Sequence, residues 1–170
     1  LDADHEAKKA LDKNTKGYYD FLSKFGDQCL DDDKEINRLK LRDLIFNNPS
    51  KKLDLEKIVH PIVKSSISTF ISKASSPYII IMVPLIFETK SQENYDRIIT
   101  VDCDVELQIS RATIRDTQNE EQISTIIDKQ ATREDRISIS DDVILNNKSL
   151  DDLKAQVLNL HLQYMELLNE

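Results

Sequence analysis

Apolar residues with a helical period dominate the first half of the chain. Between residues 53 and 73 they recur at every third or fourth position, which predicts an amphipathic helix. Pro61 lies within this pattern, where it removes one backbone donor and disfavours helical backbone at His60. We therefore expect either two helices that meet at His60-Pro61 or one kinked helix. The same period predicts helices over residues 4–14, 17–25 and 35–46, with Gly26 as a C-cap and the acidic run Asp31-Asp32-Asp33 as a solvated turn that supplies an N-cap.

Short apolar runs in the second half predict β-strands. Residues 78–83 form a continuous apolar run after Ser75-Ser76-Pro77, which is typical of a buried strand covered on both faces. Similar short runs predict two further strands, at residues 97–101 and 143–145. The segments between them are helical: Thr117 with Glu120 resembles a capping box, and Ser149 caps the last helix. Short strands that alternate with helices predict a parallel sheet in a three-layer α/β fold.

Composition narrows the classes of function. A chain of 170 residues, 39% hydrophobic and 32% charged, is long enough for one soluble domain with a core. No apolar run of membrane-spanning length and no secretion signal are visible in the sequence. Cys29 and Cys103 show no metal-type spacing, so we expect reduced thiols in a cytoplasmic protein. A net charge of −8 argues against nucleic acid as a partner. The negative net charge does not exclude a small anionic ligand, because local arginines can outweigh the overall charge.

Ligands of open parallel sheets bind beyond the carboxyl ends of the strands. In this sequence those positions hold Pro84 to Glu88, Asp102-Cys103-Asp104, and Asn146 with Asn147. The first four residues also read as a strand end followed by a helix, so Asp2 and Asp4 are expected at the same edge. A carboxylate there can accept a proton from an attacking hydroxyl or help to hold Mg²⁺. The alternative for Asp4 is a helix N-cap.

Arginines supply the candidate phosphate ligands. Arg111 and Arg115 are four apart and share one helix face, and Arg133 and Arg136 are three apart. The guanidinium fork suits phosphate oxygens, so four arginines within 26 residues suggest a lid over a polyphosphate. The alternative is two solvated helix faces with local ion pairs. Arg38 and Arg42 could likewise clamp a substrate phosphate, or they could be surface charge. His60 could reach a ligand, or it could bond a backbone carbonyl.

These motifs together resemble the dephospho-coenzyme A kinase family. The resemblance runs through Leu1-Asp2-Ala3-Asp4, Arg38-x-x-x-Arg42, His60-Pro61, Val83-Pro84-Leu85-Ile86-Phe87-Glu88, Gln108-x-x-Arg111 with Arg115-Asp116, Gln130-Ala131-Thr132-Arg133-x-x-Arg136 and Ser140-Asp141-Asp142-Val143-Ile144-x-Asn146. It implies a single P-loop kinase-like domain over residues 1–170, with a parallel sheet, a helical region at about 13–73 that receives dephospho-coenzyme A, and a lid at about 111–136.

The resemblance also implies an activity and roles for residues. ATP and 3′-dephospho-coenzyme A would give ADP and coenzyme A in the final step of coenzyme A biosynthesis, with Mg²⁺ near Asp4 or Asp2 but no assigned ligand set. Asp4 would be the base for the ribose 3′-hydroxyl. The acceptor would be held by Asp2, Arg38, Arg42, His60, Pro61, Pro84, Leu85 and Glu88. ATP would meet Arg111, Arg115, Arg133, Arg136 and Asn146. We expect a monomer or weak homo-oligomer that binds neither nucleic acid nor membrane.

Three departures from the family pattern stand out. Lys34 takes the place of a turn glycine, and Asn37 takes the place of an aspartate before the first arginine. The sequence also lacks a P-loop, since Gly17 and Gly26 are nine apart and neither precedes Lys-Ser or Lys-Thr. The family carries that loop on a first strand and helix just before Asp-Ala-Asp, so we expect a segment of roughly 30 residues upstream of Leu1 in the protein.

Two other functions are compatible with the same residues. One is a P-loop kinase with a different small-molecule acceptor. The other is a non-catalytic protein that binds an anionic ligand, which applies if the P-loop is truly absent.

Overall fold

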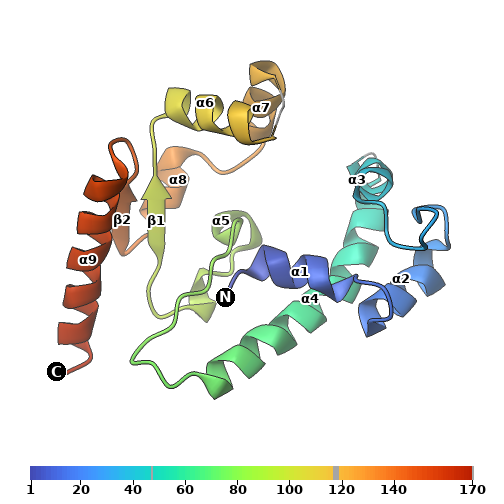
Figure 1. Cartoon of the computed structure of the whole chain (residues 1–170), viewed down its shortest axis with the longest axis horizontal. Coiled ribbons are helices and arrows are strands. Elements are labelled where there is room, and N and C mark those ends of the chain that lie inside the picture. Colours follow the sequence, from blue (N-terminus) through green and yellow to red (C-terminus); the bar gives the residue numbers. More distant parts are fainter. Residues whose placement is uncertain (47, 117–118, 170) are drawn as a thin grey trace. The chain divides into compact units, whose positions relative to one another are not determined.

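The computed structural model describes residues 1–46, 48–116 and 119–169, and these divide into an N-terminal unit, Leu1–Pro84, and a C-terminal unit, Leu85–Glu170 (Figure 1). The N-terminal unit is helical, and the C-terminal unit contains a parallel sheet with flanking helices. The predicted α/β class with a parallel sheet is therefore confirmed, whereas the single-domain organisation over residues 1–170 stays a prediction.

One long helix organises the N-terminal unit. It is α4, Pro49–Lys73, and α1 (Ala3–Ala10), α2 (Lys16–Phe25) and α3 (Arg38–Phe46) all pack against it. Phe21 is fully buried and stacks on Phe25 at a centroid distance of 4.8 Å. Helix α4 continues through Pro61, so the single-helix alternative is the observed one. Helix α1 ends at Ala10, before the predicted residue 14, because the chain turns there and Asn14 has a positive φ of 70°.

The structure shows how the turn before α3 accommodates Lys34 and Asn37, the two residues that depart from the family pattern there. Lys34 has a φ of 60°, in the left-handed region that favours glycine. Asn37 Oδ1 accepts hydrogen bonds from the backbone of Leu39 and Lys40, which caps α3 as aspartate would. The expected N-cap within Asp31–Asp33 is wrong, since Asp31 Oδ1 instead accepts from the backbone of Asp33 and Glu35 within the turn. The helix consequently begins at Arg38 and not at residue 35.

The apolar run at residues 78–83 is not the buried strand that its composition predicts. It forms one isolated parallel bridge, between Asp2 and Met82, and its other backbone partner is Leu1. Ile80 and Met82 are each 58% exposed. Among the described residues, the first three residues of the chain supply its backbone pairing, which gives too few bridges for a regular strand. The expectation that residues 1–4 are a strand end followed by a helix fits the bridge at Asp2.

Gly17 lies where α2 closely approaches both α1 and α4. A Cβ at this position would lie 2.2 Å from the Ala10 carbonyl oxygen and 2.8 Å from Ile62 Cδ1. We expect Gly17→Ala to lower the free energy of unfolding by about 1–3 kcal/mol, the usual cost of overpacking. Urea unfolding followed by circular dichroism measures it, and an unchanged midpoint would contradict the close packing of α2 on α1 and α4.

The C-terminal unit is built on two parallel strands. Strand β1, Ile99–Asp102, pairs with β2, Asp142–Leu145, in the register Asp102 to Leu145. Helix α9, Leu150–Leu167, packs on β2 and is capped by Ser149 as predicted, and α8, Arg133–Ser138, packs on β1 (Figure 1). The remaining elements are α5 (Ile86–Thr89), the 3₁₀ helix η1 (Gln92–Asn94), α6 (Val105–Asp116) and α7 (Glu120–Ile127).

Two further observations bear on the sequence predictions for this fold. Thr117 lies outside the described residues, and the observed capping box of α7 is Asn119 with Gln122. Cys29 and Cys103 are free thiols, and both are buried. Among the described helices, none combines the length and the apolar character that a membrane crossing needs.

Asp142 ties the sheet to α9. Its Oδ2 accepts hydrogen bonds from Arg97 Nε at 3.1 Å and Nη2 at 3.0 Å, and from the Tyr164 hydroxyl. Burial first, and then the hydrogen bond to the Asp142 carboxylate, raise the pKa of Tyr164 from 10 to about 12. A tyrosine whose pKa is raised in the folded state stabilises the fold fully below its unfolded pKa, and this contribution is lost as pH rises through the folded value.

The stability contributed by Tyr164 should therefore decline between pH 8 and pH 11. At pH 11 the unfolded tyrosine is ionised and the folded one is not, so the advantage of the wild type over Tyr164→Phe should shrink by about 1.4 kcal/mol. Urea unfolding of both proteins at the two pH values gives this difference, and other titrating groups cancel between them. A wild-type advantage that is equal at both pH values would contradict the raised pKa.

Candidate active site

Asp2 and Asp4 lie at the start of α1 but differ in their partners. Asp2 Oδ1 accepts hydrogen bonds from the backbone of Asp4 at 2.9 Å and His5 at 3.1 Å. Asp2 is therefore the N-cap, and the alternative that Asp4 is the N-cap is wrong. The Asp4 carboxylate is 54% exposed and lies 2.8 Å from Lys8 Nζ. Because exposed ion pairs of this kind are weak, Asp4 remains accessible to a ligand.

Backbone hydrogen bonds fix the position of this helix start. Met82 N donates to Leu1 O at 2.8 Å, and Ala3 N donates to Met82 O at 3.0 Å. The bridge places the first turn of α1 directly after a stretch of extended chain. A carboxylate in the first turn also lies near the partial positive charge of the helix N-terminus. Asp4 is thus a solvent-facing carboxylate on a fixed backbone.

Arg38, Arg42 and His60 belong to the same unit. Arg38 Nη2 donates to the carbonyl oxygen of Lys8 at 2.9 Å and lies 3.9 Å from Asp12 Oδ1, so this arginine is anchored on the last turn of α1. Arg42 is exposed and forms no ion pair within the described part of the chain. His60 and Pro61 are exposed on α4. Arg38 thereby connects α3 to the helix that carries Asp4, while Arg42 and His60 face solvent.

Glu88 and Arg136 hold one peptide group in the C-terminal unit. Glu88 Oε1, in α5, accepts a hydrogen bond from Ala131 N at 2.8 Å. Arg136 Nη1 donates to Ala131 O at 2.5 Å. Both side chains thus support the turn that leads into α8, and their assignment as substrate ligands stays a prediction. Pro84 and Leu85 are exposed where the two units join in the sequence.

Arg133 forms the most enclosed ion pair among these arginines. Its Nε donates to Asp102 Oδ1 at 3.0 Å and Oδ2 at 2.9 Å, and its Nη2 donates to Oδ2 at 2.5 Å. The Asp102 side chain is 2% exposed and that of Arg133 is 46% exposed. Arg133 is therefore attached by one edge to the carboxyl end of β1, while much of its side chain faces solvent.

Asp102 is a functional candidate that the sequence placed at the ligand edge of the sheet but to which sequence reasoning gave no role. Hydrogen bonds from Arg133 hold the pKa of the Asp102 carboxyl below its usual range, against the opposing effect of burial. The stability that this shift contributes is present above the ordinary aspartate range and is lost as pH falls through the lowered pKa. The signal was available in the sequence, because Asp102 directly follows an apolar strand at the edge where ligands of parallel sheets bind.

The remaining lid residues make local contacts. Arg111 Nη1 donates to Asn146 O at 2.7 Å and lies 3.5 Å from Cys103 Sγ. Asn146 N donates to Asp102 O at 2.8 Å, so the backbone of Asn146 joins the ends of β1 and β2. Arg115 forms two 2.7 Å bonds with its exposed neighbour Asp116. The structure thus brings Arg111, Arg133 and Asn146 to the carboxyl edge of the sheet, and it leaves Arg115 in a local surface pair.

Asp2 and Asp4 offer carboxylate oxygens of the kind that Mg²⁺ takes from a protein. Across the described residues, no group of three or more His, Cys, Asp or Glu side chains could hold a metal by itself. Mg²⁺ in kinase sites keeps several waters and takes only one or two carboxylates together with substrate phosphates. Asp4 offers an exposed carboxylate of this type, and Asp2 offers the oxygen that its capping bonds leave over.

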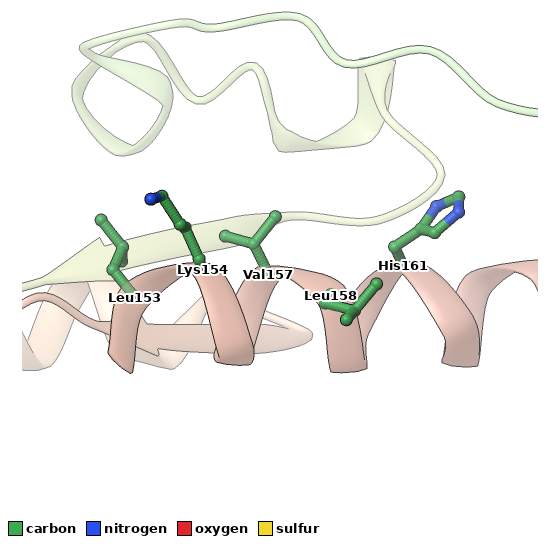
Figure 2. Close-up of a pocket in the computed structure, with 5 residues that line it drawn as sticks. All are labelled: Leu153, Lys154, Val157, Leu158 and His161. Carbon is green, nitrogen blue, oxygen red and sulfur yellow. The ribbon is translucent and has the colours of Figure 1, made fainter. Parts of the chain in front are cut away.

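Two shallow hollows lie outside these residues. One lies along α9, where Lys154, Val157 and His161 project from the same side of the helix (Figure 2). Leu153 and Leu158 complete its lining. The other lies between α1 and α4 and is lined by Glu6, Ser65, Ser66, Thr69, Phe70 and Lys73. Neither contains a residue that the sequence predicted for the site.

Comparison with known proteins shows which family this sequence matches. The family model for dephospho-CoA kinase matches residues 1–152. A dephospho-CoA kinase from Gamma-proteobacterium EBAC31A08 is 65% identical over the whole chain and 86% of its own length. The enzyme of that name from Acinetobacter baylyi is 38% identical over 97% of this chain and 85% of its own.

Solved structures agree with this result. Dephospho-CoA kinase from Campylobacter jejuni matches the whole chain and 86% of its own length with a TM-score of 0.67 at 27% identity. A Thermus thermophilus protein matches 96% of this chain and 83% of its own with a TM-score of 0.83. Its identity to this chain is 22%, so this second match shows the shared fold.

Proposed function

The chain belongs to the dephospho-CoA kinase family, and we propose that it transfers the γ-phosphoryl group of ATP to the ribose 3′-hydroxyl of dephospho-coenzyme A. The observation that carries the proposal is the family match over residues 1–152, which extends through both structural units and includes every candidate site residue. The products would be ADP and coenzyme A, in the final step of coenzyme A biosynthesis. The proposal includes a cytoplasmic enzyme that acts as a monomer or weak homo-oligomer.

Asp4 is the proposed general base. Its exposed carboxylate can accept the proton of the 3′-hydroxyl as that oxygen attacks phosphorus. Displacement of Lys8 requires little free energy, because exposed ion pairs are worth roughly 0.2–1 kcal/mol. Asp2 has a supporting role, since its capping bonds fix the backbone amides of the turn that carries Asp4.

Arg111, Arg115, Arg133 and Arg136 are the proposed ATP phosphate ligands. Phosphoryl transfer relies mainly on positioning and on stabilising the charge of the transferred group, for which guanidinium donors are suited. The partial exposure of Arg133 supports its direct role. Arg136, which bonds the Ala131 carbonyl, is proposed to act by approaching the phosphates together with α8. Asn146 is proposed to lie near the adenine, and closure of this lid would exclude water.

We propose that the acceptor is held by the residues that the family motifs supply. Arg42 and His60 supply exposed polar groups, and Pro61, Pro84 and Leu85 supply exposed apolar surface. Arg38 contributes a cation anchored on α1, and Glu88 lies beside the lid turn. Mg²⁺ bound with ATP would neutralise phosphate charge. Its protein ligands would come from Asp4 or Asp2.

A direct assay of the full-length protein tests this function. Incubation with Mg²⁺, ATP and 3′-dephospho-coenzyme A should give coenzyme A, identified by mass, in a one-to-one ratio with ADP. Competition with nucleosides and small polyols should not slow the reaction. Phosphorylation of one of those acceptors in preference would identify a kinase of different specificity, and nucleotide binding without transfer to any acceptor would indicate a non-catalytic anion-binding protein.

A further inference from the structure

Asp102 holds Arg133 by one defined edge of its guanidinium group. Nε and Nη2 donate to the carboxylate, whereas Nη1 makes no hydrogen bond to any residue that the structure describes. The bound edge meets a side chain that is only 2% exposed, and the arginine itself is 46% exposed. One edge of the planar fork is thus fixed against the sheet, and the opposite edge is available to an anion.

We propose that Asp102 is a positioning residue for the reaction, which orients Arg133 so that its Nη1 edge meets the ATP phosphates. The inference rests on the proposed function, in which Arg133 is a phosphate ligand. Asp102 itself would touch neither substrate. It would act by restricting the arginine to one orientation before ATP binds, so that less conformational freedom is lost on binding.

The location of Asp102 supports this role. It is the last residue of β1, and its backbone oxygen accepts a hydrogen bond from Asn146 N beyond β2. A carboxylate at the end of a paired strand is a more rigid support than one on a loop. Burial also excludes water from competing for its oxygens, so the ion pair keeps its geometry.

The backbone of Arg133 is also fixed by hydrogen bonds. Arg133 is the first residue of α8, and Thr132 caps that helix through a reciprocal capping box with Asp135. One residue earlier, Ala131 N donates to Glu88. The backbone and the guanidinium group are thus fixed from separate elements, α5 and β1. Such double support is expected for a side chain whose direction matters, and a surface ion pair does not need it.

A second pair in the same unit serves as a matched control. Arg97 donates through Nε and Nη2 to Asp142, which also accepts from Tyr164. This pair has the same chemistry but connects the segment just before β1 to β2, and neither residue is a candidate substrate ligand. Asp142→Asn should therefore affect stability without altering the use of ATP.

Steady-state kinetics of Asp102→Asn test the positioning role. An asparagine keeps the volume but presents an amide donor and loses the charge, so the guanidinium group is no longer held. We expect kcat/KM for ATP to fall roughly 10- to 100-fold, as for other small misplacements of a catalytic group, with KM for dephospho-coenzyme A unchanged. Asp142→Asn should lower Tm and leave both kinetic values within about twofold of wild type.

A double-mutant cycle shows whether the effect passes through Arg133. Asp102→Asn should cause less than a twofold further loss in an Arg133→Ala background, because no guanidinium remains to be positioned. A full additional loss in that background would overturn the proposal and assign Asp102 a merely structural role. A gain in ATP affinity for the single variant would also overturn it, since the pair would then restrain Arg133 away from ATP.

A second variant covers the case of misfolding, and the wild-type assay separates a failure of this inference from a failure of the proposed function. If Asp102→Asn does not fold, Asp102→Glu replaces it: it keeps the charge but shifts the carboxylate by one methylene, and it should lower kcat/KM for ATP while the ion pair persists. Wild-type kinetics for Asp102→Glu would then overturn the proposal. Absence of dephospho-coenzyme A phosphorylation by the wild-type protein would instead refute the proposed function, independently of Asp102.

Discussion

Replacing Asp4 with asparagine is expected to reduce kcat by roughly 10²- to 10⁴-fold, the usual contribution of a general base. Asparagine keeps the shape of the side chain but cannot accept the hydroxyl proton. ATP affinity should be nearly unchanged, because the arginines that we propose as its phosphate ligands are untouched. The measurement is single-turnover phosphoryl transfer in the full-length protein, together with calorimetric ATP binding.

The fold should survive this substitution. Asp2, and not Asp4, caps α1, so the helix keeps its terminal hydrogen bonds. Asp4→Asn removes an exposed ion pair and one charge near the helix N-terminus, each worth about 0.3–1 kcal/mol. Asp20→Asn is the control, because Asp20 also forms an exposed i,i+4 pair with a lysine, Lys16 on α2, with the two residues in the reverse order along the helix from Asp4 and Lys8 on α1. Turnover by Asp4→Asn at the level of this control would refute the base assignment.

Local sequence signals predicted the elements that local forces determine. Helix α2 ends at Gly26, α9 begins after Ser149, and the strands at residues 99–102 and 142–145 pair in parallel, all close to expectation. In each case a cap or a short apolar run acts within a few residues. The prediction of a buried strand at residues 78–83 was wrong because a strand depends on residues far away in the sequence. A strand requires partners, and composition alone could not show that, among the described residues, Leu1–Ala3 supply the backbone pairing of this segment.

The candidate site shows the same division. Arg133, Asp4 and Asn146 were selected because residue type and position at a strand or helix end are visible in the sequence. The partner of each side chain was not visible. Asp102 and Arg133 are 31 residues apart, and Glu88 and Ala131 are 43 apart, so their contacts depend on how β1, α5 and α8 pack together. The same packing determines that Glu88 and Arg136 bind a backbone peptide in this structure.

Replacing Arg133 with alanine should lower both activity and stability. Loss of a preorganised donor to the transferred phosphoryl group is expected to reduce kcat/KM for ATP by roughly 10²- to 10³-fold. The same change leaves the Asp102 carboxylate buried without its partner. Unpairing a fully buried charge costs about 3–5 kcal/mol, and because Arg133 is 46% exposed, water can reach the vacated space and the cost should be near the lower value. Kinetics and urea unfolding measure the two effects separately.

Three variants separate these effects. Arg97→Ala removes the corresponding arginine from Asp142, so it should lower stability and leave kcat/KM for ATP near the wild-type value. Arg133→Lys keeps the positive charge but loses the fork that binds Asp102 through two nitrogens, and its kcat/KM should stay well below wild type. Arg133→Ala with Asp102→Ala removes the orphaned carboxylate and should recover stability without recovering turnover. If activity returned together with stability in that double variant, Arg133 would support the fold alone and would have no part in binding phosphate.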